Sequence, residues 1–208
     1  MLCNRLWEKD YMGLFDKLKK SKKNDYDSHV ELHLNAHFQP VHRFPLEDAI
    51  EQMITELHLG ELEGGGTAQN PETGEIQSCD IQFCLKDTSD VTIDKFSEIV
   101  ESMGIPKGSY LQYDNQKRSV GMQEGFAIYL NGVDLPEEVY RSCDINVLIE
   151  RLESQLDGMG RMYSFWEGKE WTVLYFYGNS SFREMIAKVQ GIIDEYPLCE
   201  KCQVKQIA

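Results

Sequence analysis

The sequence predicts an α+β fold built from two successive units, each with the element order β-α-β-β-α-β. Two observations predict it. Segments with an apolar residue at every second position, typical of half-buried strands, alternate with segments whose apolar residues recur every three or four positions, typical of helices. The same order of elements then occurs a second time. We therefore expect two antiparallel four-stranded sheets, each with both of its helices on one face.

The first unit, residues 29–116, begins with a strand over 30–38 in which every second residue is apolar. A helix is predicted to begin at Pro45, because proline suits the first turn and acidic side chains follow it there. The remaining elements are, in order, a strand at 60–69, a turn at 70–74, a strand at 79–85, a helix at 93–103 ended by Gly104, and a short strand at 110–113.

The second unit, residues 117–208, repeats this order. Asp144 is predicted to cap its first helix, and Ser181 and Glu184 have the spacing of a capping box for its second. Its strands are predicted at 126–130, 161–166, 171–177 and 204–207. Short strings also correspond, since Leu32-His-Leu-Asn35 matches Ile128-Tyr-Leu-Asn131 in the first strand of each unit.

With this order of elements, residues 29–207 resemble a tandem pair of ferredoxin-like (split βαβ) domains. The resemblance implies that the uncovered faces of the two sheets are hidden against each other or by a bound guest. The chain also resembles uncharacterised bacterial proteins of the polymorphic-toxin immunity kind. That likeness rests on three strings, Glu61-x-Glu-Gly-Gly-Gly-Thr67, Cys79-Asp-Ile81 and Gly104-Ile-Pro-Lys-Gly-Ser109.

The chain is strongly acidic, with 35 acidic and 21 basic residues and a net charge of −14. A nucleic-acid-binding protein normally has the opposite sign, because its affinity comes largely from phosphate neutralisation. Seven basic residues lie in a predicted N-terminal tail, residues 1–28, which leaves 14 basic and 30 acidic residues in 29–208. Within the tail, 12–23 is either a weak contact for an anionic membrane or a solubilising segment, and Met12 is an alternative start.

We expect a cytoplasmic protein, because no signal-peptide pattern and no run of 18 apolar residues is present. Its six cysteines are then thiols. Cys199 and Cys202 form the tight pair, but a CxxC supplies only two of the four ligands of a structural zinc site, so they are weak metal candidates. No cofactor and no metal are expected, and the oligomeric state is left open.

Most apparent chemical motifs have a structural explanation. His33, Asn35 and His37 form a polar stripe on one strand face, but the two histidines lie ~13 Å apart at ~3.3 Å per residue, too far to share one ion. The glycines 64–66 lack the lysine of a phosphate-binding loop, so a β-bulge or a close backbone approach is the better explanation. No serine has the context of a catalytic nucleophile, so no catalytic residue is assigned.

One local excess remains, a run of aromatic residues in the hairpin of the second unit. Alternation places Tyr163, Phe165, Tyr175 and Tyr177 on a different face from Trp166 or Phe176. The face away from the helices either joins an inter-domain core or binds a partner, for which Tyr and Trp are favoured anchors. The predicted partner-binding residues are Tyr163, Phe165, Trp166, Trp171, Tyr175 and Tyr177.

These observations favour a non-enzymatic acidic binding protein, such as an immunity-type inhibitor of a basic bacterial toxin. Two alternatives stay open. One is a sensor of small ligands, because tandem units of the amino-acid-sensing (ACT-like) kind bind ligands at domain junctions. The other is an enzyme resembling the dimeric α+β-barrel group, with His33, His37, Tyr129 or Tyr175 as acid–base groups.

Overall fold

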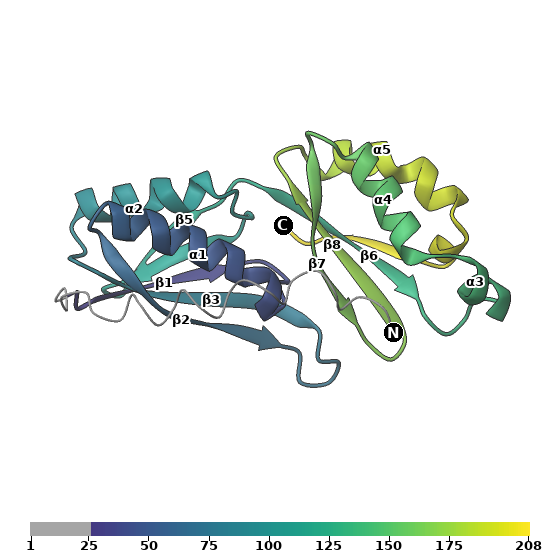
Figure 1. Cartoon of the computed structure of the whole chain (residues 1–208), viewed down its shortest axis with the longest axis horizontal. Helices are drawn as coiled ribbons and strands as arrows, with labels where there is room; N and C mark the ends of the chain where they lie inside the picture. The colour runs from purple at the N-terminus through teal and green to yellow at the C-terminus, as the bar shows by residue number, and fades with distance from the viewer. Residues whose placement is uncertain (1–25) are drawn as a thin grey trace, which may run out of the picture.

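The computed structural model describes residues 26–208 as an α+β fold with two antiparallel sheets, so the predicted α+β class is confirmed, whereas the first sheet has five strands instead of the four predicted. Figure 1 shows each sheet with its pair of long helices on one side. The predicted tail, residues 1–28, lies outside the described residues except for its last three. Among residues 26–208, no helix is long and apolar enough to cross a membrane.

The first sheet has five strands in the order β2-β3-β1-β4-β5. Helices α1 and α2 pack against the face that carries Leu32, Ile81 and Phe83. The elements are β1 (Ser28–Leu34), α1 (Pro40–Glu56), β2 (Gly60–Gln69), β3 (Ile76–Leu85), α2 (Asp90–Ser102), β4 (Ser109–Tyr113) and β5 (Gln116–Val120).

The second sheet has four strands in the order β7-β8-β6-β9. Helices α4 and α5 cover one of its faces, where Phe126, Ile128 and Leu174 are buried. The elements are β6 (Glu124–Asn131), α3 (Glu137–Ser142), α4 (Ile145–Gln155), β7 (Gly160–Glu167), β8 (Trp171–Gly178), α5 (Phe182–Glu195), the 3₁₀ helix η1 (Pro197–Cys199) and β9 (Gln203–Gln206).

The helix termini follow the local sequence. Asp144 accepts a hydrogen bond from the backbone N–H of Asn146 and caps α4, as predicted. Ser181 and Glu184 form both bonds of the predicted capping box at the start of α5. These bonds satisfy N–H groups that have no partner within the first helical turn.

Three elements differ from the predictions. Helix α1 begins at Pro40 rather than Pro45, and Pro45 lies inside it, where its missing N–H removes a single bond near the exposed first turns. The strand predicted over 30–38 ends at Leu34, although Ala36 and Phe38 remain buried. Helix α3 was not predicted, because its six residues bury no side chain and so show no apolar periodicity.

Strand β5 is a further element that the sequence did not predict, and it extends the first sheet up to Val120. Most of its residues are polar, and Val120 is its one buried residue. Asp114 and Asn115, both with positive φ, form the two-residue turn that joins it to β4. The predicted boundary between the units, at 116/117, therefore falls at the start of a strand of the first sheet.

The strands of the two sheets pair in the same register, and each sheet has a β-bulge at the equivalent position. In β2 an extra residue, Glu63, lies between the pairs Leu62–Phe83 and Gly64–Gln82. In β7 an extra residue, Tyr163, lies between the pairs Met162–Phe176 and Ser164–Tyr175. The matched strings of the sequence also occupy equivalent positions, since Leu32 pairs with Ile81 and Ile128 pairs with Leu174.

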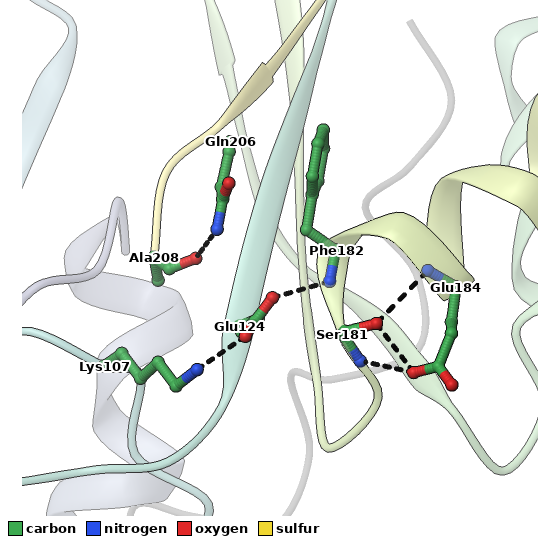
Figure 2. A network of polar contacts seen from close by, with 7 residues as sticks. All are labelled: Lys107, Glu124, Ser181, Phe182, Glu184, Gln206 and Ala208. Atoms are coloured by element: carbon green, nitrogen blue, oxygen red, sulfur yellow. Dashed lines mark hydrogen bonds and ion pairs between the residues drawn. The ribbon is translucent and has the colours of Figure 1, made fainter.

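The units meet where the helix-free face of the second sheet packs on the end of the first unit, so that Tyr175 and Tyr177 belong to the same buried cluster as Phe38 and Ile76. Polar contacts join the units beside this core. Figure 2 shows Glu124 of β6, whose carboxylate contacts the Lys107 ammonium at 2.5 Å and accepts a hydrogen bond from the Phe182 N–H at 2.7 Å. The hydrogen bond from Lys107 and the bond from Phe182 lower the pKa of Glu124.

Candidate functional site

The aromatic residues of the second sheet mostly point toward the first unit. Because Tyr163 is the extra residue of the β7 bulge, Trp166 pairs with Val173 and packs on the same face as Tyr175 and Tyr177. Phe165 pairs instead with Leu174, whose side chain lies under the helices. The predicted division of faces is therefore wrong for Phe165 and Trp166, because regular alternation does not continue through a bulge.

Two of the predicted partner-binding residues, Tyr175 and Tyr177, have no exposed surface. The Tyr175 ring stacks on the His37 imidazole, with centroids 4.6 Å apart, and the Tyr177 ring contacts Phe38 edge-on. Tyr163 and Trp171 are partly buried in the same junction, as is Trp166, whereas Phe165 keeps 39% of its surface. A partner could thus reach Phe165 and the edges of the two tryptophans, while Tyr175 and Tyr177 are covered by the first unit.

Glu75, in the loop before β3, accepts two of the hydrogen bonds that join the units. Its Oε1 atom accepts hydrogen bonds from the hydroxyl of Tyr129 at 2.7 Å and from that of Tyr175 at 2.9 Å. Burial and the Glu75 carboxylate raise the pKa of both phenols, so both stay protonated and donate. The imidazole of His37 contacts the Ile76 carbonyl, and because a carbonyl only accepts, Nδ1 carries the proton.

The predicted polar stripe is divided between two places. His37 lies in the junction, and its backbone N–H donates to the Tyr177 hydroxyl at 3.0 Å. The Asn35 amide donates to the carbonyls of Lys107 and Ile207, so it also joins the units. His33 lies on the helix-free face of the first sheet, where its Nδ1 is 2.7 Å from Asp80 and its ring stacks on Tyr110.

This helix-free face of the first sheet, which we call the open face, is the candidate functional surface. Most of its side chains are polar, and Gln82, Gln112, Lys117 and Ser119 are exposed. Side chains that the strand register places on it are Glu31, His33, Asp80, Gln82, Cys84, Tyr110, Gln112, Lys117 and Ser119. Lys117 Nζ lies 3.9 Å from the centre of the Tyr110 ring. The same ring also stacks on the imidazole of His33.

The open face is the structural equivalent of the aromatic face in the second unit. The register matches His33 with Tyr129, Gln82 with Tyr175 and Cys84 with Tyr177. One copy of this face therefore carries rings and packs on its neighbour, whereas the other carries charged and polar groups. The difference is one of side chains on the same backbone framework.

An open depression of about 510 Å³ lies at one end of this face. It is lined by residues of β1, β2, β3 and β4 and of the β4–β5 turn, with three carboxylates among them, those of Glu31, Glu63 and Asp114. The hydroxyl of Thr88 donates to Asp114, which holds the turn against the α2 side of the sheet. A shallow acidic depression of this kind can accept a basic side chain.

Cys199 and Cys202, the weak metal candidates, lie together at the end of η1. A hydrogen bond between the two thiols raises the pKa of Cys199 and lowers that of Cys202. Among residues 26–208, no His, Cys, Asp or Glu joins them as a third converging ligand. Within the described residues the pair therefore supplies two of the ligands that a structural zinc site needs.

Sequence reasoning missed several residues of the open face. Asp80, Tyr110 and Lys117 gather around His33 through cross-strand pairing, and pairing register is not visible in single strands. Glu63 points to this face at a bulge, for which the signal was the glycine run that follows it.

The buried ion pair of Arg43 and Glu47 in α1 was also missed, because charged residues are rarely fully buried.

No family model matches the chain, and no curated protein matches it. Among solved structures, it is similar to an unknown protein from Galdieria sulphuraria with 11% sequence identity, over 86% of this chain and 95% of that one. The TM-score of that match is 0.26.

Proposed function

We propose that the chain is a non-enzymatic binding protein made of tandem ferredoxin-like domains, and that the open face of the first domain recognises a basic protein partner. The proposal for the fold is supported by the strand orders β2-β3-β1-β4 and β7-β8-β6-β9. Each places the first and third strands of its unit at the centre, as two βαβ crossovers in one antiparallel sheet require.

The observation that carries the functional proposal is the contrast between two equivalent sheet faces. In the second domain the face is aromatic and is occupied by the first domain. In the first domain the same face presents Glu31, Glu63 and Asp80, with Lys117 as its one cation among the described residues. A binding face with this side-chain set favours Lys and Arg over apolar anchors.

The charge of the whole chain supports the same partner class. With a net charge of −14, the protein attracts a basic partner over a distance of about a Debye length, ~8 Å at physiological salt. Such attraction accelerates association and is weakened by salt. An inhibitor of a basic toxin in the cytoplasm of the producing cell would use this property.

Co-expression with the product of the neighbouring reading frame tests the proposal. We expect a complex whose association rate falls with added salt and falls further in the variant Glu31→Gln/Asp80→Asn. The matched control is Glu98→Gln/Glu101→Gln, which removes the same charge from exposed positions of α2. Absence of a complex, or equal rates in the two double variants, would contradict the proposed open-face interaction.

A further inference from the structure

Three side chains with metal-binding atoms converge at one end of the open face. The Nδ1 atom of His29 lies 2.8 Å from Oε2 of Glu63 and 3.9 Å from Sγ of Cys84. The three ligand atoms all lie within 4.8 Å of one another. Among the residues that the structure describes, this is the one such group of three or more His, Cys, Asp or Glu side chains.

The register of three neighbouring strands creates this convergence. His29 of β1 and Cys84 of β3 are directly paired, so their side chains leave the sheet side by side. Glu63 is the extra residue of the β2 bulge, and bulges redirect side chains. Gly64, which follows it with φ of 155°, adopts a backbone conformation that other residues rarely accept.

We propose that His29, Glu63 and Cys84 bind a zinc ion. Imidazole nitrogen, carboxylate oxygen and thiolate sulfur are the three ligand types that zinc takes in proteins, and hard cations such as Mg²⁺ and Ca²⁺ do not choose sulfur. Zinc sites with three protein ligands keep a fourth position for water or for a ligand group. Two of the three side chains, His29 and Glu63, also line the acidic depression.

The distances suit this ion after a small adjustment. Ligand atoms around a tetrahedral zinc are ~3.4 Å apart, given bonds of about 2.0–2.3 Å. The His29–Glu63 contact of 2.8 Å must therefore lengthen, and the His29–Cys84 contact of 3.9 Å must shorten, each by about half an ångström. The ligand atoms of Glu63 and Cys84, which lie within 4.8 Å of each other, must reach the same separation. The His29 side chain is 74% exposed, so it can make this movement without disturbing the core.

The second domain shows that the framework does not itself require these residues. The equivalents of His29, Glu63 and Cys84 are Gly125, Tyr163 and Tyr177. There the rings of Tyr163 and Tyr177 contact each other edge-on, 5.9 Å apart, in the domain junction. The bulge residue of the second domain, Tyr163, thus takes part in packing, whereas its equivalent in the first domain, Glu63, is one of three converging ligands.

Metal titration of the full, tag-free and reduced chain tests the site, with Zn²⁺ measured by calorimetry and Co²⁺ by absorption. We expect about one ion per chain and, with Co²⁺, a thiolate-to-metal charge-transfer band in the near ultraviolet. His29→Gln and Cys84→Ser should each weaken binding by more than the roughly tenfold that an outer-shell change costs. The His29 side chain is exposed, so its variant tests the site even if Cys84→Ser disturbs folding.

Two controls separate this site from other ligands of the chain. His33→Gln changes a histidine on the same face, and Cys199→Ser/Cys202→Ser removes the close thiol pair at the end of η1. Both variants should keep the affinity and the charge-transfer band of the unaltered chain. Absence of zinc binding, or binding that survives Cys84→Ser but is lost in Cys199→Ser/Cys202→Ser, would overturn the assignment. Either result is independent of whether a basic partner binds the open face.

Discussion

The hydroxyl of Tyr175 donates a hydrogen bond to the carboxylate of Glu75 across the junction between the two units, at 2.9 Å. The ring of Tyr175 is fully buried, and the same carboxylate oxygen also accepts from Tyr129. A buried hydroxyl without a partner destabilises a fold by the cost of its desolvation. Glu75 is therefore a residue on which the attachment of the second domain depends.

Glu75→Ala is expected to lower the free energy of unfolding by about 2 kcal/mol, because it leaves two phenolic hydroxyls without their acceptor. Urea denaturation followed by circular dichroism measures the change. Glu72→Ala, at an exposed position of the same loop, is the matched control and should change stability by less than about 0.5 kcal/mol. Equal stability of the two variants would show that the carboxylate does not hold the junction.

Acidification should weaken the junction through His37. Desolvation by burial lowers the pKa of His37 below 6.5, against the smaller opposing effects of its bond to Ile76 and of the Glu75 charge. Below pH 6.5 the unfolded chain then binds more protons at this position than the folded chain does. Stability is therefore lost as the pH falls from 6.5 through the lowered pKa of the folded state.

The variant His37→Asn tests this pH dependence, because an amide nitrogen can still donate to the Ile76 carbonyl but does not titrate. Unfolding free energies of both proteins are compared between pH 7 and pH 5. The loss of stability over this interval should be smaller in the variant than in the unaltered chain. A loss of the same size would mean that His37 makes no contribution to it.

Gly121, between β5 and β6, is predicted to be intolerant of any side chain. It has φ of 94°, and a Cβ atom would lie 2.2 Å from the carbonyl oxygen of Pro106. Gly121→Ala should therefore cost at least about 2 kcal/mol, from backbone strain and the clash with backbone atoms. Gly66→Ala is the control, because a Cβ atom there meets nothing within 4 Å; thermal unfolding should barely separate it from the unaltered chain.

The buried ion pair of α1 provides a fourth prediction. Arg43 Nε contacts Glu47 at 2.5 Å, and its Nη1 donates to the Gly66 carbonyl and the Thr67 hydroxyl, which fixes the edge strand β2 to the helix. Glu47→Ala should cost about 3 kcal/mol, because it leaves a buried guanidinium without its counter-charge. The double variant Arg43→Met/Glu47→Leu should recover part of this loss in the same urea denaturation experiment. No recovery would contradict the role of the unpaired charge.

The order of strands and long helices could be predicted because each long element has a clear apolar periodicity. The glycine run is one example of a useful local signal, since a bulge at Glu63 directly precedes 64–66 and a close approach occurs at Gly65. A Cβ atom on Gly65 would lie 2.5 Å from the Glu47 carboxylate. Strand β5 could not be predicted in this way, because its polar residues leave a single buried position.

The candidate sites could be predicted less well, because they depend on pairing between strands. His33 and His37 looked like one stripe along the sequence, but the chain leaves the sheet after Leu34, and the two residues serve different surfaces. Along the sequence Cys84 has no metal-ligand spacing to another residue, and only its cross-strand pairing with His29 places its thiol beside an imidazole. Because of a bulge in β7, Trp166 lies on the same face as Tyr175 and Tyr177, whereas regular alternation had predicted the opposite face.

The junction around Tyr177 also has a consequence for how the chain can be divided. A fragment containing only the second sheet and its helices would expose Tyr175, Tyr177 and Val173 to water, and a fragment of the first would uncover Phe38. Neither half buries its junction residues by itself, so we expect that neither half folds stably on its own. Truncation for expression should therefore keep both, and heating should melt the chain as a single cooperative body.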